Sequence, residues 1–270
     1  MPPARPKLEH LRRQLAALET PAARRIVLST GLAAIDRALP WGGLPVGALH
    51  DIDGGVGDVA AVGFAAAVAA AAQRRCGGRV LWCRHRRTVH DRGAVYAPGL
   101  TAWGLHPRHV VFTACNSPGD VLWAMEEGLR ARGFAAVVGD GVAPDFTAAR
   151  RLQLSGSDGT AIALAIQPAA TSAPASHSPA LTRWRITALP TATDNCARND
   201  PALTPRAWRV ELLHCRGAAP RAWAVRWDHF ENREIADAPL SGAVATPLAD
   251  GPVAARSTAV PGARRTAAGR

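Results

Sequence analysis

The chain has 270 residues, 48% of them hydrophobic, which is enough to bury the core of one large domain plus tails. No stretch of about 18 apolar residues is free of charge, which excludes a membrane-spanning helix, and residues 1–10 lack the apolar stretch of a secretory signal. We therefore expect a cytoplasmic protein. The formal net charge of +11 suggests a nucleic-acid partner, but an Arg- and Ala-rich chain from a GC-rich genome acquires the same charge, so both explanations stay open.

The cysteines are odd in number and irregularly spaced, which favours free thiols over a disulfide framework: Cys76, Cys83, Cys115, Cys196 and Cys215. Cys83, His85 and His90 lie close together in sequence, but no second pair of metal ligands accompanies them. We expect neither a metal nor a cofactor.

Residues 1–25 are predicted to form a short basic helix, because leucines recur at spacings of three and four residues. Such a stripe usually packs on its own domain, and binding to a partner helix is the alternative. From residue 26 onward, predicted strands alternate with helices. The strands are expected at Ala48–Ile52, Arg79–Cys83, Val110–Phe112, Ala135–Val138 and Ala161–Ile166.

Two helices are predicted between these strands. The first is an Ala-rich segment from about Val59 to Arg75. The second is capped by Ser117 and ended by Gly133, with Asp120 in its first turn and a buried stripe at Val121, Met125 and Leu129. Strands that alternate with helices and lack polar alternation indicate an α/β fold, with a mainly parallel sheet flanked by helices.

The pattern changes after Gln167. Residues 168–180 are predicted to be a loop, followed by C-terminal antiparallel strands at Arg183–Ile186, Arg209–His214 and Trp223–Trp227. Trp208, Val210, Leu212 and His214 are expected to share one face of their strand. Residues 236–270 lack periodicity and are predicted to be a disordered basic tail, so that the main domain spans residues 26–235.

A Gly-rich turn with Gly54 and Gly57 lies between the first predicted strand and helix, where a phosphate-binding loop would be. A working loop needs a Lys for the β- and γ-phosphates and a Ser or Thr hydroxyl for Mg²⁺. Ala60 and Ala61 occupy those two positions, and Asp58 adds a negative charge beside them. We therefore interpret the turn as a degenerate phosphate loop, and we expect no ATP hydrolysis.

The segments Ser29–Asp36 and Gly42–Gly47 resemble the opening motif of the RecA core. Carried over residue by residue, the resemblance makes Asp140 the acidic residue that ends the second nucleotide-site strand, and Gln167 the sensor glutamine. Residues 83–87 hold no carboxylate where RecA-type proteins have their catalytic glutamate. His214 and Arg216 match the basic positions of a late hairpin that meets the neighbouring subunit's nucleotide.

Among RecA relatives, the chain is most similar to the ImuA family of damage-inducible mutagenesis proteins. Residues 96–100, 122–127, 149–154, 184–190 and 208–213 carry this likeness. It implies a non-catalytic accessory factor in SOS-induced, error-prone translesion DNA synthesis. The implied partners are an ImuB-type protein, an error-prone C-family DNA polymerase and, as a further candidate, RecA. The alternatives are a SulA-like cell-division inhibitor that binds FtsZ, and a divergent ATP-dependent DNA-binding recombinase.

Several basic residues are candidates for contact with nucleic acid or a partner protein. Arg150 and Arg151 follow the fourth strand, where two adjacent arginines could contact phosphates, although a solvated helix start is the favoured explanation. The arginines of the late strands interleave with tryptophans on which bases could stack, although tryptophans at alternating positions are more often core. These late candidates are Arg183, Arg185, Arg209, His214, Arg216 and Arg221.

Overall fold

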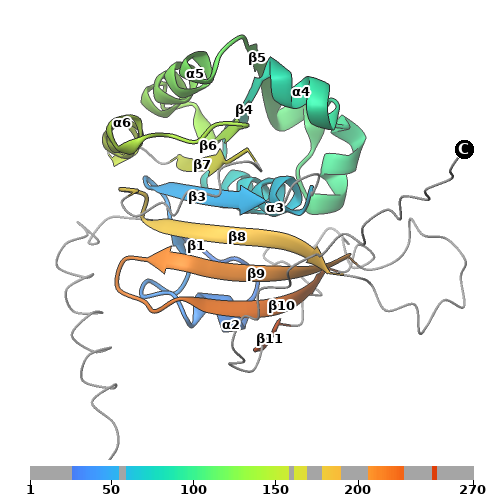
Figure 1. Cartoon of the computed structure of the whole chain (residues 1–270), viewed down its shortest axis with the longest axis vertical. Helices are drawn as coiled ribbons and strands as arrows, with labels where there is room; N and C mark the ends of the chain where they lie inside the picture. Colours follow the sequence, from blue (N-terminus) through green and yellow to red (C-terminus); the bar gives the residue numbers. More distant parts are fainter. Residues whose placement is uncertain are drawn as a thin grey trace, which may run out of the picture.

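A computed structural model describes residues 26–54, 59–157, 161–168, 178–189, 206–227 and 245–247. The helix predicted for residues 1–25 and nearly all of the tail predicted for residues 236–270 lie outside these ranges. The described strands form a two-stranded ribbon and a nine-stranded sheet of order β11-β10-β9-β8-β3-β7-β6-β4-β5 (Figure 1). The strands of the large sheet are β3 (Leu49–Gly54), β4 (Arg79–His85), β5 (Val110–Cys115), β6 (Phe134–Asp140), β7 (Ile162–Ile166), β8 (Thr182–Leu189), β9 (Arg206–Cys215), β10 (Arg221–Trp227) and β11 (Ala245–Pro247).

The direction of the strands confirms the predicted fold class. All neighbours from β8 to β5 run parallel, while β8–β9, β9–β10 and β10–β11 are antiparallel. The short strand β11 lies within the segment predicted to be disordered, where its backbone pairs with edge strand β10. A strand at the edge of a sheet has unpaired backbone N–H and C=O groups. A short segment can form hydrogen bonds with them without a hydrophobic pattern of its own, so β11 could not be predicted from its side chains.

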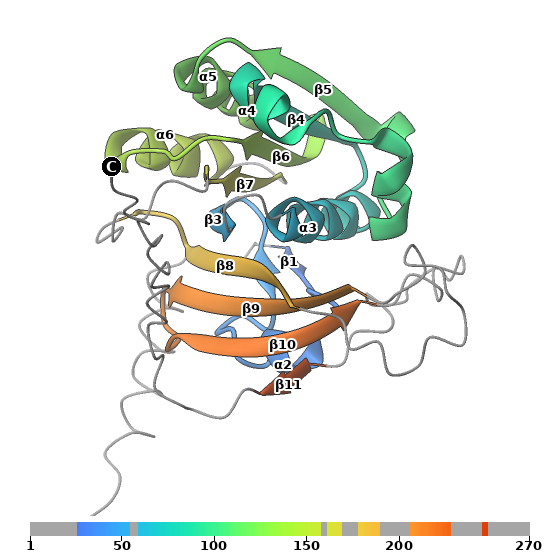
Figure 2. The same ribbon diagram turned by 45° about the vertical axis from the view of Figure 1, so that its right-hand side comes forward.

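Helices cover both faces of the parallel strands, as Figure 2 shows. Helix α3 (Ala60–Cys76) packs on one face, in a core that also holds Trp82, Trp184 and Trp208. Helices α5 (Pro118–Arg130) and α6 (Phe146–Ser157) pack on the other face. Because α3 is nearly all Ala on its buried side, the helix approaches the sheet closely and leaves room for these large aromatic rings.

Helix α5 begins as predicted and ends differently. Ser117 Oγ accepts from the Asp120 N–H at 3.1 Å, and Asp120 Oδ2 accepts from the Ser117 N–H at 3.0 Å, which closes a capping box. The predicted stripe, Val121, Met125 and Leu129, is buried. The prediction that Gly133 ends the helix is wrong, because the helix stops at Arg130 and Arg132 takes the left-handed conformation with φ 51°.

The predicted common face of β9 is also corrected by the structure. Trp208, Val210 and Leu212 are buried on the α3 side, but His214 is exposed. An irregularity in the β8–β9 ladder pairs Trp184 with Leu212 but the preceding Arg183 with His214. One extra residue in β9 therefore turns His214 onto the opposite face, which is the known effect of a β-bulge.

Near its start, the chain forms a ribbon of β1 (Val27–Leu28) and β2 (Leu44–Pro45) around the short helix α2 (Ala33–Asp36). The Asp36 carboxylate accepts hydrogen bonds from Ser29 Oγ at 2.6 Å and from Thr30 N and Oγ1 at 2.9 and 2.7 Å. Residues 29–36 therefore make a self-contained turn. Among the helices that the structure describes, none has the length and apolar character to cross a membrane.

Candidate functional site

The carboxyl ends of the parallel strands form the edge where α/β proteins usually bind ligands. Strand β3 ends there at Gly54, and α3 begins at Ala60, while Gly57 and Asp58 lie outside the described residues. Ala60 and Ala61 are buried in the core and bring neither a cation nor a hydroxyl to the start of α3. The residues present here therefore do not fit a magnesium–nucleotide complex, which a RecA-type fold implies.

Asp140, the carboxylate at the end of β6, is buried and paired with a cation from its own chain. Arg84 on the neighbouring strand β4 places its Nε 2.7 Å from Asp140 Oδ2, and the side chains are 8% and 0% exposed. The Arg84 Nη1 group also donates to the Gly93 carbonyl at 2.9 Å. Residue 84 lies in the segment where RecA-type proteins have their catalytic carboxylate, and no local sequence pattern predicts its ion pair with Asp140.

Gln167, the predicted sensor residue at the end of β7, is buried and accepts a hydrogen bond at Oε1 from Arg183 Nη2 at 2.9 Å. Arg183 stands beside Asp51 of β3 in the strand register. Burial raises the pKa of the Asp51 carboxyl above its usual 3.8, although the hydrogen bond from Ser178 and the charge of Arg183 oppose that rise. Asp51 Oδ1 has no hydrogen-bond partner among the described residues.

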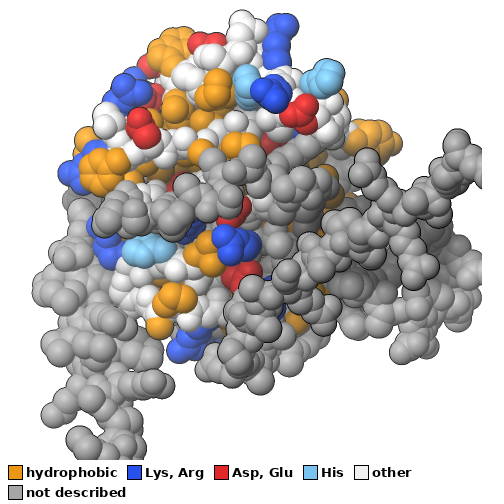
Figure 3. Space-filling view, in the orientation of Figure 1, with side chains coloured by type: hydrophobic (Ala, Val, Ile, Leu, Met, Phe, Trp, Pro, Cys, Tyr) orange, Lys and Arg blue, Asp and Glu red, His pale blue; other side chains and the backbone are white. Residues whose placement is uncertain are grey.

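Other predicted contact residues are held by carboxylates of their own chain. Arg185 Nη2 lies 2.9 Å from Asp53 Oδ2, and Arg209 Nε lies 3.1 Å from Glu211 Oε1. In the same way, Arg151 Nε of α6 lies 2.8 Å from Glu126 Oε1 of α5. Their positive charges are therefore offset locally before any ligand arrives. On the face seen in Figure 3, blue and red side chains are interspersed rather than gathered into one patch.

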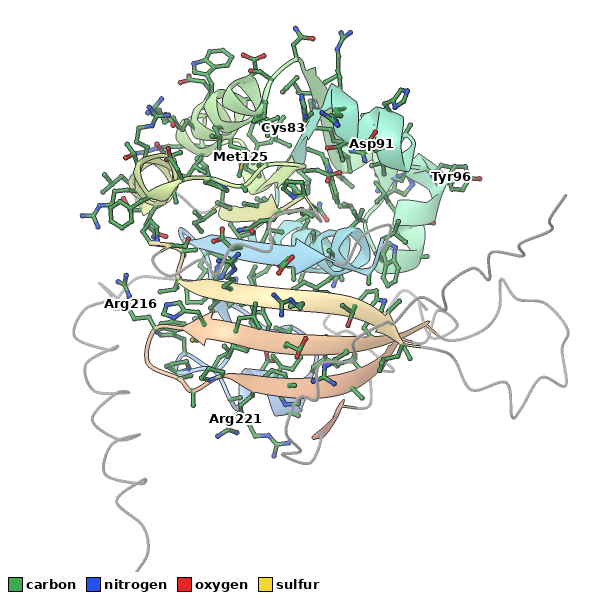
Figure 4. All side chains as sticks on the ribbon, viewed as in Figure 1. Cys83, Asp91, Tyr96, Met125, Arg216 and Arg221 are labelled. Carbon is green, nitrogen blue, oxygen red and sulfur yellow. The ribbon has the colours of Figure 1, made fainter. Side chains whose placement is uncertain are left out.

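The remaining candidates are exposed, and no ion pair joins them to a described residue: Arg150, Arg216 and Arg221. Figure 4 places Arg216 and Arg221 at the β9–β10 hairpin, far along the sheet from the end of β3. Although His214 is exposed, partial desolvation of its imidazole, and after it the charges of Arg216 and Arg183, lower its pKa below the usual 6.5. His214 is thus neutral at pH 7, and the positive charge of the hairpin comes from its arginines.

The thiols and the metal-binding side chains show no reactive arrangement in the part of the chain that the structure describes. Burial raises the pKa of Cys83 and of Cys215 to about 12, so neither thiol forms a nucleophilic thiolate at neutral pH. No group of three or more His, Cys, Asp or Glu residues is placed to hold a metal ion within the described ranges. The tryptophans proposed as stacking platforms, Trp184 and Trp208, lie in the core.

Comparison with known proteins then identifies the family. No family model matches the chain. Protein ImuA of Caulobacter vibrioides, in strain NA1000 / CB15N and in strain ATCC 19089 / CIP 103742 / CB 15, is 33% identical over 240 residues, covering 85% of this chain and 93% of the relative. Among solved structures, a KaiC-like protein of Pyrococcus horikoshii OT3 covers 83% of this chain and 100% of that chain, with 12% identity and a TM-score of 0.49. By its identity to Protein ImuA over nearly the whole length of that relative, the chain belongs to the ImuA family.

Proposed function

We propose that this chain is a non-catalytic accessory factor in SOS-induced, error-prone translesion DNA synthesis. The observation that carries the proposal is the 33% identity to Protein ImuA along 85% of the chain. The proposed partners are an ImuB-type protein, an error-prone C-family DNA polymerase and RecA. Protein contact is the proposed mode of action, in the cytoplasm.

The side chains at the carboxyl ends of the strands support the non-catalytic part of this proposal. Phosphoryl transfer depends on a phosphate-binding Lys, on a metal held by a Ser or Thr and an Asp, and on a residue that positions the nucleophile. Ala60 and Ala61 supply neither the phosphate-binding Lys nor the metal-binding hydroxyl. The carboxylate of Asp140 forms an ion pair with Arg84. ATP turnover is therefore not expected.

The β9–β10 hairpin, residues 214–221, is the proposed partner contact. Arg216 and Arg221 are exposed there, and no described carboxylate pairs with them. Exposed arginines are frequent anchors of protein interfaces, because a guanidinium forms directed, bidentate hydrogen bonds with carboxylates. We expect an acidic patch on the partner.

The proposal is tested by affinity purification of the tagged full chain from cells with damaged DNA. An ImuB-type protein, the error-prone polymerase or RecA should co-purify. Recovery of FtsZ without them would instead establish the cell-division alternative. The hairpin is tested with Arg216→Glu/Arg221→Glu, which should abolish partner recovery, and with Arg87→Glu as a matched exposed arginine, which should not. Equal recovery with both variants would place the contact elsewhere.

A further inference from the structure

The Arg84–Asp140 pair is unusual because it lies where α/β proteins present acidic groups to ligands. Asp140 ends strand β6, and Arg84 is its register partner on β4. Residues in register on neighbouring strands lie about 5 Å apart, so the two side chains meet without reorganisation. In nucleotide-hydrolysing relatives of this fold class, a carboxylate at such a strand end holds Mg²⁺.

We propose that the Arg84 guanidinium permanently replaces the cation at this site, so that the ligand-binding end of the sheet is neutralised by the protein itself. The inference deepens one part of the proposed function, the lack of nucleotide turnover, and rests on that part alone. A buried carboxylate requires a compensating charge, because its transfer from water is otherwise strongly unfavourable. Arg84 provides that charge at 2.7 Å.

The pair is closely packed on the side that faces α4. Arg84 is tied on its other side to the Gly93 carbonyl, after helix α4 (Arg86–Arg92). Gly141, next to Asp140, has φ +84°, and a Cβ at this position would overlap Thr88 Oγ1 of α4. The segment after β4 is therefore packed against the end of β6. A cation that approached Asp140 would have to displace both the guanidinium and this packing.

The described residues at the start of α3 also lack the side chains that would bring a nucleotide to this edge. Ala60 and Ala61 begin α3 without a charged or hydroxyl side chain. Arg84 is thus the cation that contacts Asp140 within the described residues. Arg84, Asp140, Ala60 and Ala61 together suit a site whose charge is neutralised by the protein itself. The guanidinium contacts Asp140 Oδ2, while the buried Oδ1 accepts no hydrogen bond from a described residue.

The test measures urea unfolding of the purified full chain, with and without millimolar MgCl₂ and ATP. Arg84→Met should lower the folding equilibrium constant about 10²- to 10³-fold, because Asp140 keeps an uncompensated buried charge. Adding Asp140→Asn to this variant should recover at least about tenfold of that loss, since the isolated charge disappears. Arg87→Met breaks the exposed Arg87–Asp91 pair, at 3.7 Å, and should change the constant less than about fivefold.

Magnesium distinguishes replacement of a cation from an ordinary structural contact. MgCl₂ should raise the urea midpoint of Arg84→Met and leave the wild type and the double variant unchanged. An equal response of all three would overturn the proposal, as would purely additive effects of the two substitutions. So would a saturable rise of the wild-type midpoint with MgCl₂ and ATP, since a ligand that binds the folded state stabilises it.

If Arg84→Met does not fold, the proposal is tested instead with Arg84→Lys and with the double variant Arg84→Met/Asp140→Asn. Both should fold under the proposal, the first because it keeps a cation and the second because it removes the charge that needs one. Failure of both would overturn it. Because these measurements involve no partner protein, a purification that recovers only FtsZ would refute the proposed function and leave this inference standing.

Discussion

Trp208 provides the sharpest test of whether the late tryptophans serve the fold or bind nucleic acid. Its ring is 4% exposed and stacks on Trp103, with centroids 4.9 Å apart and planes at 27°. A Cβ on Gly63 of α3 would lie 2.9 Å from the Trp208 ring, so the helix also touches it. We expect Trp208→Ala to lower the free energy of unfolding by about 3–5 kcal/mol.

The magnitude follows from the buried area and the ring contact. A buried Trp removes roughly 200 Å² from water, which at about 25 cal/mol per Å² contributes about 5 kcal/mol. Compaction of the unfolded chain lowers this figure by roughly 10–40%. The stacked pair with Trp103 adds about 0.5–1.5 kcal/mol, which gives a sum of about 3.5–6 kcal/mol; its lower part overlaps the range of about 3–5 kcal/mol that is typical of replacing a buried Trp by Ala.

The assay is urea unfolding followed by far-ultraviolet circular dichroism, because the other tryptophans would confuse fluorescence. The matched control is Trp123→Ala on α5, whose side chain is 65% exposed and should cost no more than about 0.5 kcal/mol. Domains of this size have about 5–15 kcal/mol of total stability, so Trp208→Phe serves if the Ala variant does not fold. If Trp208→Ala left the midpoint unchanged and weakened single-stranded DNA binding, our placement of Trp208 would be refuted.

Two further substitutions test the packing and the electrostatics of the sheet. Asp51→Asn should raise the unfolding midpoint at pH 7. Because the pKa of Asp51 is raised in the folded state, the protonated carboxyl favours folding: its contribution is complete below the pKa of the unfolded state and is lost as pH rises through the pKa of the folded state. The advantage of the variant should shrink in urea titrations toward pH 4, and an unchanged advantage would contradict the assignment. Gly139→Ala should cost about 1–3 kcal/mol because its Cβ would overlap Met125 Sδ, whereas Gly133→Ala, with its nearest atom at 3.8 Å, should be neutral in thermal melts. Equal melting temperatures of the Gly139→Ala and Gly133→Ala variants would contradict this expectation.

Helices α3 and α5 and most of the parallel strands could be predicted because each depends on a local pattern. Short apolar runs without polar alternation predicted the strands that became β4, β6 and β7. Ser117 and Asp120 lie only three residues apart, so their capping box is visible in sequence. The end of the same helix could not be predicted, because the exposed residue Arg132 takes a left-handed conformation that Gly usually adopts.

The candidate site could be predicted in what it lacks and, through the resemblance, in the positions of Asp140 and Gln167, but the contacts of these residues could not be predicted. Ala60 and Ala61 reveal the absent phosphate and metal groups directly, because a motif compares single positions. The Arg84–Asp140 pair joins residues 56 positions apart, and nothing in the local sequence selects that partner among the other acids. The sequence does show a basic residue near the end of one predicted strand, Arg84, and an acidic residue at the end of another, Asp140. The two can be paired only once the strand order, with β4 beside β6, is known. His214 was misplaced for the same reason, since the bulge arises from how β8 and β9 pair.

The positive charge of the chain gives the last prediction, because local pairing divides its arginines into two groups. Arg185 is paired with Asp53, whereas Arg150 and Arg216 are exposed and no described carboxylate pairs with them. Each Lys or Arg that contacts a phosphate adds about one unit to the slope of log K against log salt. If the chain binds single-stranded DNA directly, Arg150→Ala or Arg216→Ala should lower that slope by about one unit in fluorescence anisotropy titrations, while Arg185→Ala should not. A lower slope with Arg185→Ala alone would mean that DNA displaces the Asp53 pair, and that the sheet face rather than the exposed arginines is the nucleic-acid surface.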